Sequence, residues 1–137
     1  MKYILDTDTC IFALKQRMGV LNRLLQESPD DIAVSAMTEA ELAFGAFKSA
    51  YPERAKPQVS AFLEPVLVLP FDSEAAQKHA EIRFAVRSTP IGERDMVTAA
   101  VAVANGLTLV THNTREFSRV EGLALEDWAE SPLPGAG

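Results

Sequence analysis

Short runs of apolar and β-branched residues alternate along the chain with longer segments of helical periodicity, and this alternation constrains the fold more than any other feature of the sequence. The runs, bounded by acids, proline or glycine, predict strands at residues 3–5, 32–35, 66–70 and 107–111, with a short edge strand at 123–125. Helical patterns occupy residues 9–17, 20–28, 37–51, 57–63, 74–87 and 94–105. Helices that separate successive strands are typical of parallel sheets with both faces covered. The sequence therefore predicts an α/β fold with a central parallel sheet of four to five strands flanked by helices.

A single domain accounts for the length of the chain. Of its 137 residues, 47% are hydrophobic and 23% charged, which suits one buried core. We expect this domain to span residues 1–130, and the segment 131–137, rich in proline and glycine, to form a short flexible tail. Cys10 is the single cysteine, so an internal disulfide is excluded, and we interpret it as a small buried side chain. Because the sequence has neither a run of about 20 apolar residues nor a signal-peptide pattern, we expect a soluble, cytoplasmic protein without membrane association.

The charge of the chain argues against broad, nonspecific binding to nucleic acids. Thirteen lysines and arginines stand against nineteen acids, which gives a net charge of -6. Contacts with phosphates supply most of the affinity in nonspecific binding, and an acidic surface opposes them. If such a protein acts on RNA, it needs positive charge placed locally, either as bound divalent cations or as clustered arginines.

The helical segment 94–105 is apolar on nearly every side. Its sequence, RDMVTAAVAVAN, consists mostly of small residues, so we expect a helix buried against the sheet and ended by Gly106. Arg94 and Asp95 at its start would bring charge to the edge of the core.

Four acids follow the predicted strands at positions that place them at one edge of the sheet. Asp6 comes directly after the first strand, and Glu41 lies in the first turns of the helix after the second. Asp95 lies in the first turn of the buried helix, and Glu116 lies in the loop HNTREF after the fourth strand. Because ligands of open α/β sheets bind beyond the carboxyl ends of the strands, we expect these side chains to gather there. Asp8 either shares the site or caps the first helix.

Each acid also has a purely structural explanation. Asp6 or Asp8 could be the N-cap of the first helix, and Glu41 could form a capping box with Thr38. Asp95 could interact favourably with the dipole of its helix, and Glu116 could be a solvated loop residue. Together, however, four carboxylates at one rim would repel one another unless cations neutralise them. Oxygen ligands without a histidine or cysteine cluster favour Mg²⁺, with Mn²⁺ as a substitute, over zinc.

The two histidines do not form a catalytic pattern. His79 lies within a helical segment and is interpreted as a surface residue, whereas His112 lies beside the proposed site, where it either contacts substrate or has a supporting role. The sequence has no Ser-His-Asp spacing, no glycine-rich phosphate loop and no G-x-S-x-G motif. Nucleophilic hydrolases and P-loop enzymes are therefore not indicated.

Three stretches of the chain resemble the VapC toxins, which carry a PIN domain. They are LDTDTCIF, SAMTEAELAFGA and TPIGERDMVTAAVAVANGLTLVTHNTREFSRVEGLALEDW, in the family's order and with its usual spacing. The resemblance implies a three-layer α/β/α PIN domain. It also implies that Asp6, Glu41 and Asp95 are the three core metal-binding acids and Glu116 the more variable fourth. Thr7, Thr111 and Asn113 match positions where the family places polar groups around the metal.

Two positions depart from the pattern of close relatives. Position 8 is Asp where relatives commonly have Asn, and position 112 is His where they commonly have Asn. Neither change removes a core acid, so the resemblance still implies an active site.

The resemblance further implies a toxic, Mg²⁺-dependent endoribonuclease that cuts a tRNA anticodon loop, with the initiator tRNA as the target in similar toxins. It implies a homodimer and a VapB-type antitoxin that covers the acidic pocket and builds higher assemblies. An acidic pocket would accept an antitoxin arginine in place of the metal. Arg94, Arg115 and Arg119 flank the predicted site and are candidates for holding the RNA backbone.

Two other functions fit parts of the sequence. A phosphoacceptor receiver domain is also small, acidic and α/β, and Asp72 could serve as its acceptor, but the fourth strand is followed by His112 and Asn113 rather than by the required lysine. A catalytically silent PIN scaffold that only binds RNA or a partner is the second alternative, and the intact acids argue against it.

Overall fold

The computed structural model describes residues 1–130 and shows one five-stranded, all-parallel sheet. In chain order the strands are β1 (Tyr3–Leu5), β2 (Ile32–Ser35), β3 (Leu67–Leu69), β4 (Thr108–Val110) and β5 (Leu125–Glu126). Their spatial order is β3-β2-β1-β4-β5, so β1 lies at the centre. The predicted parallel sheet is confirmed, and it has a fifth strand at its edge, which begins at Leu125 rather than at residue 123. The tail predicted at residues 131–137 lies outside the described residues.

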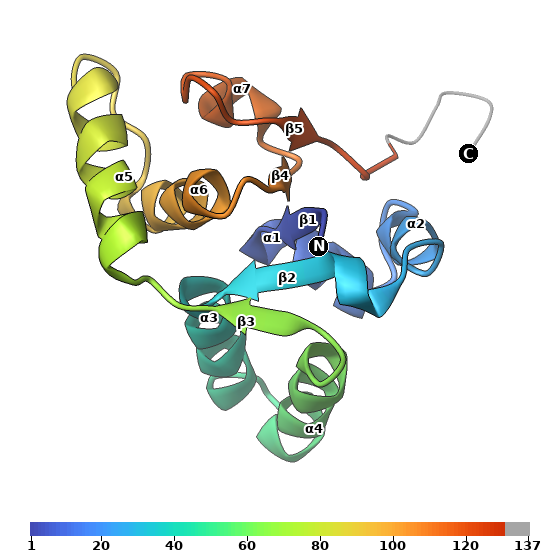
Figure 1. Cartoon of the computed structure of the whole chain (residues 1–137). Coiled ribbons are helices and arrows are strands. Elements are labelled where there is room, and N and C mark those ends of the chain that lie inside the picture. The colour runs from blue at the N-terminus through green and yellow to red at the C-terminus, as the bar shows by residue number, and fades with distance from the viewer. Residues whose placement is uncertain (131–137) are drawn as a thin grey trace.

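Helices cover both faces of this sheet (Figure 1). They are α1 (Thr7–Leu14), α2 (Val20–Leu24), α3 (Ala36–Phe47), α4 (Pro52–Leu63), α5 (Ser73–Ala85), α6 (Glu93–Ala104) and α7 (Thr114–Phe117), with a 3-10 turn at Pro29–Asp31. Ile4 points into a core formed with α5 and α6, whereas its neighbour Leu5 points into a second core formed with α1, α3 and α4. This alternation of side chains along β1 produces the predicted three layers.

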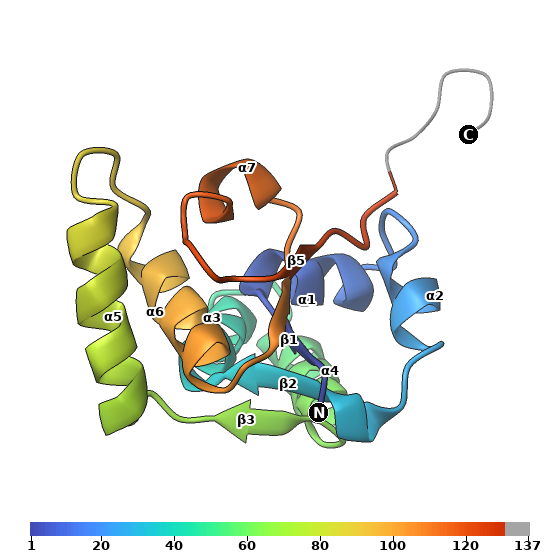
Figure 2. The same cartoon turned by 45° about the horizontal axis from the view of Figure 1, so that its top comes forward.

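Helix α6 lies between α5 and the strands (Figure 2). Met96, Thr98 and Ala99–Ala102 are buried, because small side chains allow close approach to the sheet. Gly106 follows the helix with a φ of +65°, a left-handed conformation that favours glycine. The prediction of a buried helix ended by Gly106 is confirmed.

Several helix boundaries differ from those predicted. Helix α1 begins at Thr7 rather than at residue 9, because Asp6 is its N-cap. The capping box assigned to Thr38 and Glu41 is wrong, since Ser35 caps α3 by accepting a hydrogen bond from the Thr38 N–H (3.1 Å). Helix α3 ends at Phe47 and not at residue 51, and α4 begins at Pro52, five residues before the predicted start. The residue before a proline is disfavoured in a helix, whereas proline itself suits the first helical position.

Two shorter elements also depart from the prediction. Helix α2 ends at Leu24, and Ser28 caps a 3-10 turn instead of continuing the helix. Glu116 lies in the four-residue helix α7 rather than in a loop. None of the helices in residues 1–130 has the length and apolar character required to cross a bilayer.

Candidate active site

The carboxyl end of β1 is the point where the strand order changes direction. From β1 the sheet extends through β2 to β3 on one side and through β4 to β5 on the other. Asp6 directly follows β1, and its backbone N–H donates a hydrogen bond to the carbonyl of Val110 at the end of β4 (3.1 Å). The first candidate acid therefore lies at the switch point where open parallel sheets bind their ligands.

Asp6 is almost fully buried, with 5% of its surface exposed. Its carboxylate accepts a hydrogen bond from the Thr9 backbone N–H (2.9 Å). Burial raises the pKa of Asp6 above its usual value, hydrogen bonds from Thr111 and Thr9 offset part of this rise, and the negative charge of Asp8 adds to it. Within the described residues, no cation is among the groups that shift this carboxyl.

Asp95 lies half-buried in the first turn of α6 and has the most perturbed carboxyl of the site. Its pKa is raised to about 6, first by burial and then by neighbouring negative charges. In order of size, these charges belong to Glu116, Asp6, Asp8 and Glu41. Four of the five acids named from the sequence thus act on the fifth, so the structure brings all of them to the same edge of the sheet.

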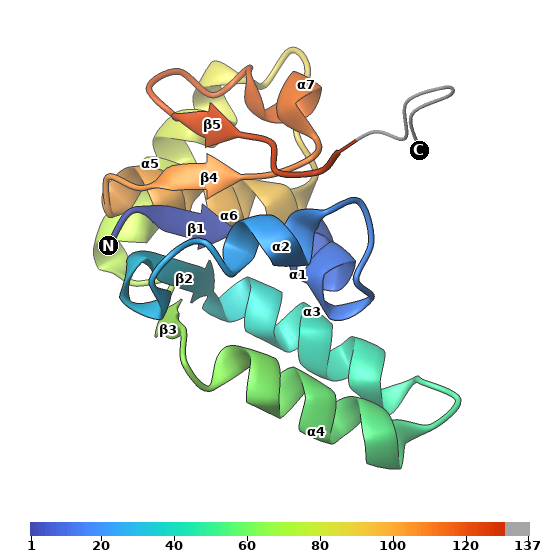
Figure 3. The same cartoon turned by 90° about the vertical axis from the view of Figure 1, so that its right-hand side faces the viewer.

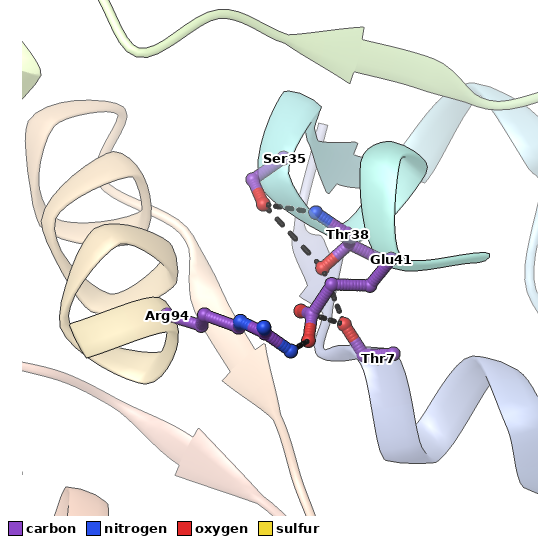
Figure 4. A network of polar contacts seen from close by, with 5 residues as sticks. All are labelled: Thr7, Ser35, Thr38, Glu41 and Arg94. Carbon is purple, nitrogen blue, oxygen red and sulfur yellow. Dashed lines mark hydrogen bonds and ion pairs between the residues drawn. The ribbon is translucent and has the colours of Figure 1, made fainter. Parts of the chain in front are cut away.

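Glu41 reaches toward this edge from α3 and is held by two protein groups (Figure 4). The Thr7 hydroxyl donates to one carboxylate oxygen (2.7 Å), and the Arg94 guanidinium pairs with the other (3.3 Å). The Thr7 oxygen also lies within hydrogen-bond distance of the Thr38 hydroxyl (3.2 Å), which in turn lies within hydrogen-bond distance of Ser35 (3.4 Å). A chain of hydroxyl groups therefore links the end of β2 to the Glu41 carboxylate.

Glu116 is held in a different way, by neutral donors. The Gly92 backbone N–H donates to one oxygen (3.0 Å) and the Asn113 side-chain amide to the other (2.7 Å). These two hydrogen bonds, followed by the charge of Arg119, lower the pKa of Glu116. The backbone N–H of Asn113 donates to the Thr111 hydroxyl (2.9 Å), so Thr111 connects the surroundings of Glu116 with those of Asp6.

The donor chemistry fits a hard divalent cation, although the side chains are not closed around one. Within residues 1–130, no three histidine, cysteine, aspartate or glutamate side chains are grouped closely enough to hold a metal ion in this arrangement. Glu41 and Glu116 instead point their oxygens at protein donors. The mutual repulsion that raises the pKa of Asp95 is what a divalent ion would relieve, and the available oxygen ligands are those preferred by Mg²⁺ and Mn²⁺.

The remaining candidates lie around this centre. Asp8 is exposed in the first turn of α1 and is not the helix cap. Arg94 lies over Glu41, and Arg115 is exposed on α7. Arg119 is exposed too, and besides its effect on Glu116 it lines a separate hollow beside α5.

His112 pairs through Nδ1 with Asp127 (3.0 Å) and contacts the edge of Phe12. This arrangement favours the supporting role over direct contact with substrate. His79 is half-buried against the ring of Phe71, so it is less exposed than predicted. Cys10 is buried as expected, and the thiol pKa is raised by burial.

Asp72, the candidate phosphoacceptor, accepts a hydrogen bond from the Ala75 N–H (2.9 Å) and caps α5. This structural use leaves the receiver interpretation without its acceptor.

A groove of about 400 Å³ leads away from the acids between α1 and α3. Glu41 and Arg94 lie at one end, and Phe44, Gly45 and Lys48 continue the wall along α3. This face of α3 therefore borders an open groove. Two further contacts were missed, namely Gly92 with Glu116 and Arg94 with Glu41, because both join segments far apart in the chain.

Comparisons with known proteins agree with this architecture. The PIN domain family matches residues 3–123. A curated relative from Salmonella typhimurium, the tRNA(fMet)-specific endonuclease VapC, is 38% identical, and the match covers 93% of this chain and 98% of that protein. The protein of the same name from Shigella flexneri is 37% identical over 94% of this chain and 99% of its own length.

The fold of this chain also matches that of a solved structure. The crystal structure of DNA-bound VapBC from Salmonella typhimurium includes a chain with a TM-score of 0.88 and 37% sequence identity. The superposition covers 94% of this chain and 99% of that one. On these grounds the chain belongs to the PIN-domain family, and within that family to the VapC-type ribonuclease toxins.

Proposed function

We propose that this chain is a divalent-metal-dependent endoribonuclease whose catalytic centre consists of Asp6, Glu41, Asp95 and Glu116. The observation that carries the proposal is the gathering of these carboxylates at the switch point of the sheet, where burial and then the charges of Glu116, Asp6, Asp8 and Glu41 raise the pKa of Asp95. Such a concentration of negative charge destabilises the site unless a cation binds there. This concentration of negative charge would not help a silent scaffold that only binds RNA.

When bound, Mg²⁺ or Mn²⁺ would lower the pKa of a water molecule and neutralise charge on the scissile phosphate. Asp6 and Asp95 are the direct ligands in this proposal, and Glu41 is a direct or water-mediated one. Thr9 and Thr111 orient the Asp6 carboxylate, and Thr7 orients that of Glu41. Thr7, Thr111, Asn113 and Asp8 therefore support the ligands instead of reacting.

Glu116 has a distinct task in this scheme. Its pKa is lowered by the Gly92 and Asn113 donors, so the side chain stays ionised. An ionised carboxylate held on both oxygens suits the binding of a second ion or the orientation of the attacking water. In this proposal Arg94 and Arg115, with Arg119 farther out, hold the RNA backbone beside the acids.

The proposed substrate is a tRNA, cut in its anticodon loop, and specifically the initiator tRNA. This part rests on the names of the relatives from Salmonella and Shigella, which are tRNA(fMet)-specific endonucleases 38% and 37% identical to this chain. The open groove beside the acids offers space for a single-stranded loop.

The proposed partner is a VapB-type antitoxin, which would bind a homodimer of this chain and form larger assemblies. Similar solved structures are VapBC complexes, among them those from Salmonella typhimurium and Rickettsia felis bound to DNA. A partner arginine could neutralise the acidic cleft in place of the metal, as Arg94 already does for Glu41 within the chain.

The decisive experiment is a cleavage assay with purified chain and purified tRNAs, in Mg²⁺, in Mn²⁺ and in EDTA. We expect one tRNA to be cut at one position in either metal and none to be cut in EDTA. Asp6→Asn is the matched control, because it keeps the shape and the capping ability of the side chain while removing its charge. Equal cleavage by the native chain and the Asp6→Asn variant, or cleavage that persists in EDTA, would refute the metal-dependent centre.

A further inference from the structure

Phe44, at the far end of the groove, is the first of three exposed aromatic residues that the proposed catalytic centre does not use. Phe44 and Phe47 on α3 and Tyr51 in the α3–α4 turn are 63%, 66% and 60% exposed. Aromatic side chains are normally buried, so three exposed ones between residues 44 and 51 require an explanation. We refer to Phe44, Phe47 and Tyr51, together with the cations beside them, as the aromatic tip.

Each of these rings has a cation over it. Lys48 lies 5.2 Å from the ring centre of Phe44, Arg54 lies 5.2 Å from that of Tyr51, and Lys56 lies 4.0 Å from that of Phe47. All three cations are exposed. Within residues 44–56 they stand against a single acid, Glu53, whereas the whole chain carries a net charge of -6. The aromatic tip is therefore a positive patch on an acidic protein.

The aromatic tip is continuous with the catalytic centre. The strands all run toward the same edge, and α3 and α4 extend side by side beyond it (Figure 3). Phe44 and Lys48 line the same groove as Asp8, Glu41 and Arg94. A strand bound in this groove would reach the acids at one end and Phe44 at the other, and Phe47 and Tyr51 follow within the next seven residues of the chain.

Gly45 keeps the wall of the groove open. It lies inside α3, where glycine is unfavourable compared with alanine, and it has no positive φ that would require glycine. A Cβ at this position would meet no heavy atom within 4 Å, so packing does not require glycine either. The missing side chain leaves space between Phe44 and Lys48 that a ligand can use.

We propose that the aromatic tip is a binding platform for unpaired nucleotides of the RNA substrate. Bases stack on exposed aromatic rings in a sequence-tolerant way, while lysine and arginine side chains contact the phosphates between them. A neutral apolar partner would gain little from the three cations, whereas RNA offers both bases for the rings and phosphates for the cations, and this favours RNA as the occupant. The proposal rests on the proposed ribonuclease function and names how that site holds its substrate.

The test measures RNA binding separately from cleavage. A fluorescein-labelled RNA stem–loop is titrated with the full chain in EDTA, and fluorescence anisotropy reports the affinity. In the triple variant with Phe44→Ala, Phe47→Ala and Tyr51→Ala, we expect a loss on the order of 100-fold, with a much smaller loss for a duplex of the same stem, whose bases are already stacked. Thermal unfolding checks that the exposed substitutions leave the fold intact.

Two further variants separate the contribution of base stacking to RNA binding from the contributions of the cations and of the shape of the groove. Replacing Lys48, Arg54 and Lys56 by glutamine should reduce the slope of log affinity against log salt by about 2, as expected when three contacts with single-stranded phosphates are lost. Gly45→Leu adds bulk to the groove without removing any contact and should also weaken binding of the stem–loop.

Phe84→Ala is the matched control, because Phe84 on α5 is 67% exposed and has Arg87 3.9 Å from its ring centre. An equal loss from Phe84→Ala, or native affinity in the triple aromatic variant, would overturn the platform. A change of oligomeric state on gel filtration with unchanged RNA affinity would instead assign the aromatic tip to contacts between copies of the chain. Tight RNA binding by a native chain that does not cleave would refute the proposed function while leaving the platform standing.

Discussion

The inner and outer acids of the site differ in what the protein provides for them. Asp6 and Asp95 form the inner pair, and burial raises the pKa of both. Glu41 and Glu116 form the outer pair, and each has both carboxylate oxygens occupied by protein donors. Although Thr9 and Thr111 donate to Asp6, no cation in residues 1–130 is among the groups that shift the pKa of either inner acid, so a bound divalent ion would offset their charge. The outer pair is already held on both oxygens by protein donors.

This difference separates two roles within one cluster of carboxylates. Carboxylates whose negative charge is not offset by a cation of the protein are the ones available to bind a metal ion. Side chains fixed by the protein are better suited to orient water or substrate, because their position does not depend on the metal. The four predictions below test this division, beginning with the inner pair.

Asp95→Asn should have the largest effect and should change activity and stability in opposite directions. Loss of a direct ligand lowers the cleavage rate by about 1000-fold or more, the scale on which the loss of a catalytic group acts. In the metal-free protein the same change removes a carboxylate whose ionised form opposes folding. The folded pKa of about 6 lies above the ordinary aspartate value of 3.8, so the penalty is absent below about pH 4, grows between pH 4 and 6, and is complete above pH 6.

The stability that Asp95→Asn should gain over the native chain follows from the raised pKa of Asp95. The rise from 3.8 to about 6 corresponds to about 3 kcal/mol, which solvent screening of a half-exposed group reduces to about 1–2 kcal/mol. Urea unfolding of the metal-free native chain and the Asp95→Asn variant at pH 4 and pH 7.5 would measure it. A variant less stable than the native chain at pH 7.5 would show that the inner pair is not under electrostatic strain.

Metal binding should relieve the inner pair and raise the thermal midpoint of the native chain. At a Mn²⁺ concentration of 100 times the dissociation constant, the expected stabilisation is about 2.7 kcal/mol. The effect should weaken as the pH falls through 6, where Asp95 takes up a proton. Asp6→Asn should show little stabilisation by Mn²⁺, and an equal shift in that variant would place the metal elsewhere.

The same division explains which parts of the molecule the sequence could predict. Strands β1 and β2 were predicted to the residue, because each buried run ends at a polar helix cap, Asp6 or Ser35. The location of the inner acids followed from a topological rule, since parallel strands present their carboxyl ends at one edge. Both signals are local in the sequence or common to the fold class.

The surroundings of the outer pair could not be predicted in this way. Gly92 and Glu116 are 24 positions apart, and Glu41 and Arg94 are 53 apart, so their contacts depend on how whole helices are placed. Helix α7, with four residues, is too short to show helical periodicity. The exposure of Phe44 could not be predicted for a related reason, because the sequence does not reveal that α3 extends beyond the sheet.

Glu116→Gln should have a moderate effect, because this residue belongs to the outer pair. Groups that orient ligands or water without binding the metal directly change activity by about 10- to 100-fold when replaced. Because its pKa is lowered in the folded chain, the ionised side chain adds stability above its unfolded pKa, and this contribution is lost as the pH falls through the lower folded pKa. A cleavage rate as low as that of Asp95→Asn in the same assay would place Glu116 in the inner group.

Arg94→Gln should have the smallest effect and the opposite sign for metal binding. Arg94 is 71% exposed and pairs with Glu41 (3.3 Å), so it competes with the metal for an outer carboxylate through an ion pair worth about 1 kcal/mol or less. Its removal should tighten Mn²⁺ binding by up to about fivefold in calorimetric titration. Arg119→Gln removes an equal charge that acts on Glu116 rather than Glu41, and serves as the control for the general loss of positive charge. Of these two arginines, Arg94 is the one that pairs with Glu41, so equal tightening in both variants would mean that this ion pair does not compete with the metal. The division between inner and outer acids would then not extend to Glu41.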